Sequence, residues 1–144
     1  MDKKYLVWEV VKIAREHRKT VEKRVCSLGI HPSQHHFLMH IAKNGVCTQN
    51  SFAEAMEISA ATVAVSLKKL EKGGYIEKQI SRSDGRSNVI GLTKKGEDVV
   101  EKSRAMFEEV DQAMFASITE QEQEQLHNYM ERIINNLKAI EEAN

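Results

Sequence analysis

A predicted helix over residues 60–72 carries side chains whose order along one face suits contact with a nucleic acid. The residues expected to point outward are short near the start and basic near the end: Ala61, Thr62, Val65, Ser66, Lys69 and Lys72. Short side chains let a helix backbone approach base edges in the major groove, while lysines contact the phosphates beside it. Thr62 offers a hydroxyl and a methyl group, and Val65 offers an apolar contact to a thymine methyl. An exposed helix with ordinary surface lysines explains the same pattern.

A second candidate site is the polar segment 81–88, which lies between two predicted strands at residues 75–80 and 89–92. Arg82 and Arg86 flank the turn formed by Asp84 and Gly85. An arginine on such a projection can enter a narrow minor groove, where the potential is most negative. Asp84 would repel phosphate, so we expect it to hold a nearby arginine or the turn. Such turns are common on surfaces, but this one follows a lysine-flanked helix, and the combination favours DNA binding.

A few chain breakers separate the elements that must position these residues. Helices are expected over 5–28, 33–43, 49–56, 60–72, 94 to about 116, and 120 to about 142. Gly29 and the Gly73-Gly74 pair end helices, because glycine accepts left-handed backbone angles. Thr48, Ser59 and Thr119 are expected N-caps, the last in a capping box with Glu122. Ala60, Val63, Leu67 and Leu70 share one helical face and are expected to be buried. Residues 33–92 therefore read as a winged helix-turn-helix core.

The helices at both chain ends carry more apolar surface than this small core can cover. In the last helix Leu126, Met130, Ile133, Leu137 and Ile140 recur at spacings of four and three, the pattern of a seam against another helix. The simplest partner is the same helices of a second copy. We therefore expect a single domain over residues 1–144 that forms a homodimer through residues 5–28 and 94–142.

Composition is that of a soluble cytoplasmic domain. The chain has 144 residues, of which 41% are hydrophobic and 29% charged, with no apolar run near the roughly 20 residues of a membrane span. The N-terminus has no secretion signal, and two cysteines fit a reducing compartment. Net charge is zero, but residues 1–47 carry nine basic and four acidic groups, residues 48–96 eight and five, and residues 97–144 four and twelve. The neutral total therefore does not exclude a polyanionic partner.

The sequence resembles the MarR family of bacterial transcription regulators. The resemblance lies in Ser-Ala-Ala-Thr-Val at 59–63, Leu-Lys-Lys-Leu-Glu-Lys-Gly-Gly-Tyr-Ile at 67–76, Arg-Ser-Asp-Gly-Arg at 82–86 and Leu-Thr-Lys-Lys-Gly at 92–96. It implies a mainly α fold with a small β-hairpin wing and long dimerisation helices. It also implies a homodimer that binds a pseudo-palindromic operator on double-stranded DNA, usually as a repressor released by a small molecule, an oxidant or a metal.

Carried over by position, the resemblance implies DNA contacts by Ser59, Ala61, Thr62, Val65, Ser66, Lys68, Lys69, Arg82, Asp84 and Arg86. Arg86 is expected in the minor groove and residues 59–66 in the major groove. Val65 departs from the pattern because many relatives have arginine there, and valine cannot form a bidentate bond to guanine. His35 also departs, since an aromatic or apolar residue is frequent at its position.

A zinc-responsive regulator is the first alternative. His31, His35, His36 and His40 cluster in the sequence, and histidines four residues apart on a helix can share a metal. Zinc-responsive members of the family use a cysteine and a glutamate late in the first helix and a histidine early in the second; Glu22, Cys26 and His36 match in type and order but not in spacing. Half-buried or surface histidines explain the cluster better, because the fifth helix has no histidine-rich stretch to complete such a site, so we predict no metal and no cofactor.

Three further alternatives are weaker. Cys26 beside Lys23 and Arg24 is an oxidant-sensor candidate, although peroxide-sensing relatives have their cysteine nearer the start of the first helix. An enzyme is not expected, because the sequence has no phosphate loop, HExxH, GxSxG or CxxC motif. A winged-helix adaptor that binds proteins and not DNA predicts an apolar or acidic outer face over residues 60–72, where lysines stand instead.

Overall fold

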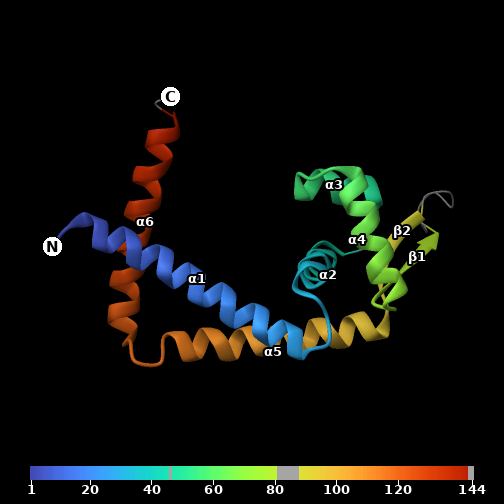
Figure 1. The fold of residues 1–144 in the computed structure, drawn as a ribbon, viewed down its shortest axis with the longest axis horizontal. Coiled ribbons are helices and arrows are strands. Elements are labelled where there is room, and N and C mark those ends of the chain that lie inside the picture. Colours follow the sequence, from blue (N-terminus) through green and yellow to red (C-terminus); the bar gives the residue numbers. More distant parts are fainter. Residues whose placement is uncertain (46, 81–87, 143–144) are drawn as a thin grey trace. The chain divides into compact units, whose positions relative to one another are not determined.

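The computed structural model describes residues 1–45, 47–80 and 88–142. In this part of the chain, six helices and one antiparallel hairpin follow one another (Figure 1). Their bounds are α1 Lys3–Ser27, α2 Pro32–Asn44, α3 Gln49–Met56, α4 Ala60–Lys72, β1 Ile76–Ile80, β2 Asn88–Leu92, α5 Lys94–Met114 and α6 Glu120–Glu142. The predicted mainly helical, winged helix-turn-helix fold class is confirmed.

The chain divides into two compact units, Met1–Phe107 and Glu108–Asn144. The boundary falls within α5, so the first unit holds α1 to α4, the hairpin and most of α5, and the second holds the end of α5 and α6. The single domain expected over residues 1–144 stays a prediction. Across the described residues, every helix is too short or too polar to cross a lipid bilayer.

Local signals in the sequence set the break between α1 and α2. Gly29 follows α1 with φ of 81°, a left-handed conformation that side chains other than hydrogen disfavour. Pro32 takes the first position of α2, where its missing N–H leaves no hydrogen bond unmade. The backbone nitrogen of Ser33 donates to Nδ1 of His31 at 3.2 Å, which caps α2. The predicted break at this point is confirmed.

α3 and α4 form the helix-turn-helix pair, and α4 contacts both α3 and α2. The Thr48 hydroxyl accepts from the backbone nitrogen of Ser51 at 3.1 Å, and Ser51 Oγ accepts from the backbone nitrogen of Thr48 at 3.0 Å, so α3 begins with reciprocal caps. Glu57 adopts a left-handed φ of 54° and turns the chain. Ser59 Oγ then accepts from the backbone nitrogen of Thr62 at 3.2 Å, which starts α4 at the predicted residue.

The core of the first unit is built around α4 and the aromatic side chains of α2 and α3. Val63, Leu67 and Leu70 are buried as predicted. The rings of Phe37 and Phe52 stack with centroids 5.5 Å apart. The prediction that Ala60 is buried is wrong. Ala60 is the first residue of α4, one turn before Val63 begins the buried face, and it is exposed.

The hairpin is attached to the helix-turn-helix through the middle of β2. β1 and β2 pair with Ile76 opposite Leu92 and Lys78 opposite Ile90. The backbone nitrogen of Cys47 donates to the carbonyl of Ile90 at 3.3 Å, and the backbone nitrogen of Ile90 donates back at 2.7 Å. These bonds join β2 to the segment just before α3 and so hold the hairpin beside the helix-turn-helix pair.

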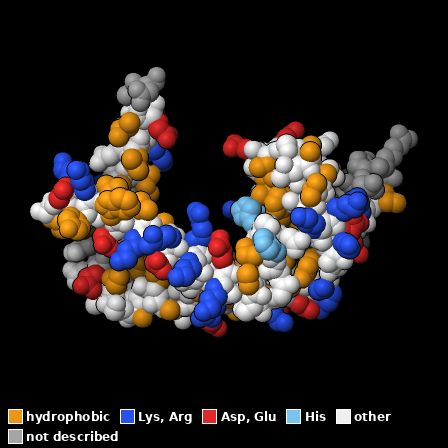
Figure 2. All heavy atoms as spheres, viewed as in Figure 1, with side chains coloured by type: hydrophobic (Ala, Val, Ile, Leu, Met, Phe, Trp, Pro, Cys, Tyr) orange, Lys and Arg blue, Asp and Glu red, His pale blue; other side chains and the backbone are white. Residues whose placement is uncertain are grey.

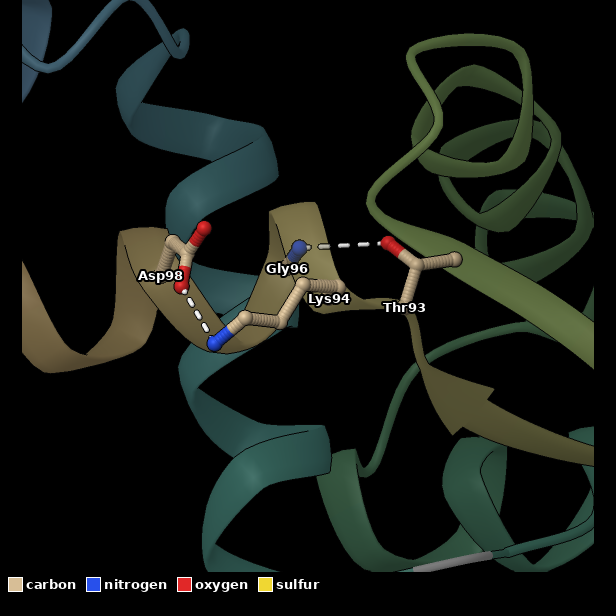
Figure 3. A network of polar contacts seen from close by, with 4 residues as sticks. All are labelled: Thr93, Lys94, Gly96 and Asp98. Atoms are coloured by element: carbon tan, nitrogen blue, oxygen red, sulfur yellow. Dashed lines mark hydrogen bonds and ion pairs between the residues drawn. The ribbon is translucent and has the colours of Figure 1, made fainter.

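A close backbone contact fastens the start of α5 to the turn after α4. The Thr93 hydroxyl accepts from the backbone nitrogen of Gly96 at 3.1 Å (Figure 3) and donates to the carbonyl of Gly74. The backbone nitrogen of Thr93 donates to the carbonyl of Tyr75 at 3.1 Å. A Cβ atom on Gly96 would lie 2.1 Å from that same Tyr75 oxygen. Only glycine permits this approach without movement of the backbone.

Next to this contact, Lys94 and Asp98 form an ion pair on the surface of α5 at 3.0 Å (Figure 3). A hydrogen bond to Asp98 and its negative charge raise the pKa of Lys94. Both side chains are well exposed, so we expect the pair to add little to stability.

We predict that Gly96→Ala lowers the free energy of unfolding by about 1–3 kcal/mol, because the added methyl must displace the Tyr75 backbone. Urea unfolding followed by circular dichroism measures the change. Gly91→Ala is the matched control, since the atoms nearest to its Cβ would belong to the flexible Gln79 side chain, at 3.5 Å or more. Equal destabilisation by the two variants would contradict the steric explanation.

Candidate DNA-binding surface

α4 presents a face of short and basic side chains on the side opposite its buried residues. Ala61, Thr62, Val65, Lys68 and Lys69 are exposed, whereas Ser66 is half-buried at the edge of this face. Figure 2 shows Lys and Arg side chains gathered over α4 and the hairpin. The helix therefore carries the predicted order of small residues followed by lysines on its solvent side.

The lysines of this face are available to an anionic partner. Within the described residues, Lys68, Lys69 and Lys72 form no ion pair. The acidic residue of this helix turn, Glu71, pairs with β1 instead, where its Oε2 lies 3.8 Å from Lys78 Nζ. Lysines in the last turn of a helix also interact favourably with its dipole. Phosphate binding and helix stabilisation are therefore compatible roles for these side chains.

The hydroxyl groups at the start of α4 are paired with each other. Ser59 Oγ and Thr62 Oγ1 lie 2.8 Å apart, in addition to the cap that Ser59 provides to the Thr62 backbone. Ser59 thus has a structural role beside its predicted contact to DNA. Thr62 is exposed on the outward face.

The tip of the wing lies outside the described residues. Arg82, Asp84 and Arg86 all belong to it, so their predicted contacts stay predictions. β1 leads toward the tip with exposed Lys78 and with Ile80, whose side chain is 69% exposed.

Tyr75 and Lys95 position α4, a role that the sequence patterns do not reveal. The Tyr75 hydroxyl donates to the carbonyl of Gly29, just after α1, at 3.3 Å. Lys95 Nζ donates to the carbonyl of Gly73, the C-cap of α4, at 2.7 Å and lies 4.5 Å from the centre of the Tyr75 ring. A cation is favourable both at a helix C-terminus and over an aromatic face. The ends of α1 and α4 and the start of α5 therefore meet on one buried tyrosine.

In the sequence, the residues that make these contacts belong to two short motifs, Gly-Gly-Tyr and Thr-Lys-Lys-Gly, which stand about 20 residues apart. Their spacing follows no helical or strand period, so it does not predict contact. Tyr75 was expected to begin the first strand, but that strand begins at Ile76.

His35 is a core residue that joins α2 to α5. Its side chain is buried, its ring centroid lies 5.9 Å from that of Phe107, and Nε2 lies 2.8 Å from Ser103 Oγ. Ser103 uses its single hydroxyl hydrogen to donate to the carbonyl of Val99 at 2.7 Å, so Nε2 of His35 must be the donor to Ser103. Burial, together with the positive charge of nearby His36, lowers the pKa of His35. The histidine thus fills the place of an aromatic residue.

The metal and oxidant-sensor candidates differ in what the structure shows. Among the described residues, no three histidine, cysteine, aspartate or glutamate side chains lie close enough together to hold a metal ion, although Glu22, Cys26, His36 and His40 were candidates. His40 instead packs against Phe52 in a T-shaped arrangement, with ring centroids 4.9 Å apart. Cys26 is exposed, as an oxidant sensor requires.

Comparisons with known proteins agree with this geometry. The sequence model of the MarR family matches residues 28–87. The HTH-type transcriptional regulator BilQ of Clostridium symbiosum (strain WAL-14163) is 30% identical over 116 residues, which cover 81% of this chain and 78% of that protein.

Two crystal structures from Staphylococcus aureus are also similar. MepR, a transcription regulator of the multidrug efflux pump MepA, is 25% identical with a TM-score of 0.78, covering 95% of this chain and 99% of that one. The complex of MepR with DNA is 26% identical with a TM-score of 0.66, covering 91% and 95%.

We predict that the free energy of unfolding falls as the pH drops below about 6.5, the ordinary pKa of an unfolded histidine. Because the pKa of His35 is lowered in the folded protein, the unfolded chain takes up the proton at a higher pH than the folded chain does. The contribution of neutral His35 to the free energy of unfolding is therefore complete above pH 6.5 and is lost as the pH falls toward the folded-state pKa. Urea unfolding between pH 7.5 and 5 measures this. His35→Gln should flatten the profile, and His127→Gln, on exposed α6, should not. Parallel profiles for the wild type and His35→Gln would contradict the assignment.

Proposed function

The chain belongs to the MarR family of transcriptional regulators, and on this premise we propose that it is a homodimeric repressor. It binds a pseudo-palindromic operator through α4 and the wing, and a small-molecule effector releases it. The proposal assigns it no enzymatic activity and places it in the cytoplasm, where operator DNA is accessible.

The observation that carries the proposal is the outward face of α4. Burial of Val63, Leu67 and Leu70 leaves the small residues and the lysines on the other side of the helix, where they face solvent. A helix of this kind can lie in the major groove with its lysines against the phosphates. An adaptor that binds proteins would need an apolar or acidic face here.

The second copy is proposed because two helices carry apolar side chains that the single chain does not cover. In α1 the exposed ones are Tyr5, Leu6, Val7, Trp8, Val10, Val11 and Ile13. In α6, whose residues are all described, none is buried, and Tyr129, Met130, Ile133, Ile134, Leu137 and Ile140 are exposed. Figure 2 shows hydrophobic side chains on the surface of α6. Exposed apolar areas of this extent mark interaction surfaces.

A two-fold axis through such a dimer would place two copies of α4 in successive major grooves about 34 Å apart, with the wings over the flanking minor grooves. Phosphate contacts would provide most of the affinity, so binding should weaken steeply as salt rises. An effector that acts where the long helices meet the winged core would change the spacing of the two α4 helices and so release the DNA.

The experiment that tests the proposal is selection of bound duplexes from random DNA by the purified protein. We expect an inverted repeat whose half-site centres are about one helical turn apart, and two protein chains per duplex by sedimentation. Transcription in vitro from a promoter that overlaps this repeat should then fall when protein is added. Failure to enrich any duplex, or binding by a single chain, would contradict the proposal.

We predict that Lys69→Ala weakens binding to operator and to unrelated duplexes alike, because its partner is a phosphate. The slope of log affinity against log salt should become shallower by about one for each half-site, since each copy of the variant neutralises one phosphate fewer. Fluorescence anisotropy at several salt concentrations measures both quantities. Lys102→Ala, an exposed lysine of α5, is the matched control and should change neither. An unchanged slope in Lys69→Ala would remove this lysine from the interface.

A further inference from the structure

The outward face of α4 has few groups that can hydrogen-bond to bases before its lysines begin. Residues 59–66 contain no arginine, asparagine, glutamine or acidic residue. The side chains that form bidentate bonds to guanine or adenine are therefore missing from the part of α4 that approaches the bases. The exposed groups there are the methyl groups of Ala60 and Ala61, the Thr62 side chain and Val65.

The hydroxyls of Ser59 and Thr62 are bonded to each other, which uses one of their two hydrogens. Ser59 Oγ accepts from the Thr62 backbone at 3.2 Å, and the two side-chain oxygens lie 2.8 Å apart. The bond from the Thr62 backbone nitrogen to Ser59 Oγ starts the helix, so a base that competed for this oxygen would disturb the cap. Besides its hydroxyl, Thr62 can offer a partner its methyl group.

Val65 is the largest apolar group on this face. Its side chain is 56% exposed, although its neighbours Val63 and Leu67 are buried. It stands three residues after Thr62, so the two side chains are neighbours on the helix surface. The exposed lysines at 68 and 69 continue the same face and favour a polyanion over an apolar protein as the occupant.

We propose that Val65 determines the sequence specificity of the protein by packing against thymine methyl groups. The C5-methyl of thymine is the apolar group that the four base pairs offer in the major groove, and aliphatic side chains recognise it by contact. Val65 reads a thymine in each half-site, and the Thr62 methyl adjoins it at the same or the next base pair. The proposal rests on the proposed function, since it assumes that α4 lies in the major groove.

Deoxyuridine tests this contact because it differs from thymidine by the methyl group alone and keeps every hydrogen-bonding group. Each thymine of the selected operator is replaced in turn, symmetrically in both half-sites. The affinity of the wild type, Val65→Ala and Lys69→Ala is measured by fluorescence anisotropy. Val65 is exposed, so Val65→Ala is expected to fold, and circular dichroism checks this.

For the wild type, removal of a methyl should weaken binding about fourfold for each half-site at the one or two positions that Val65 contacts. In Val65→Ala the same replacements should change affinity less than about twofold, because alanine is too short to fill the contact. In Lys69→Ala, where only a phosphate contact is removed, the full effect of uracil should remain.

Two results would overturn the proposal while the proposed function stands: an operator that binds equally well with uracil at every position, or a uracil effect that persists undiminished in Val65→Ala. The second would assign the effect to the shape of the DNA or to another residue. Absence of specific binding to any duplex would instead overturn the proposed function and this inference with it.

Discussion

Packing of one side of α4 against α2 and α3 decides which residues of this helix meet solvent. Val63, Leu67 and Leu70 occupy the buried side, and Val63 and Leu70 have no exposed surface at all. A rotation of the helix that exposed any of them would sacrifice the burial of a whole aliphatic side chain, worth about 1.5–3 kcal/mol each. The exposure of Thr62, Val65 and the lysines follows from this constraint, because the other side of a helix with a fixed apolar face must point outward.

The buried face fixes the rotation of α4 about its own axis. The tilt of α4 depends on the contacts at its C-terminal end. The carbonyl of Gly73 is bound by Lys95 at 2.7 Å, and Tyr75 reaches Gly29 at the end of α1. The close approach of Gly96 to the Tyr75 carbonyl leaves little room for movement at this point. The ends of α1 and α4 and the start of α5 are therefore joined through these contacts. This arrangement is the physical basis on which a change in the long helices would reach the DNA-binding surface.

Features that depend on local chemistry were predictable from the sequence. The helix break at Gly29 and Pro32, the caps at Thr48 and Ser59 and the buried side of α4 follow from residue type and helical period, and the structure agrees. Ala60 was misplaced because the period cannot tell where packing against neighbouring helices begins. The link between His35 and Ser103 spans 68 residues, and the contact of Lys95 with Tyr75 depends on how two chain segments cross. No periodicity in the sequence contains such information.

The most direct measurement of the central claim is photocrosslinking from the outward face of α4. A benzoylphenylalanine introduced at position 61, which is exposed, would be irradiated in the complex with the selected operator. If α4 lies in the major groove of a duplex bound by two chains, crosslinks should map to bases at symmetric positions in both half-sites. Crosslinks to protein alone, from a complex that still binds the duplex, would contradict the account.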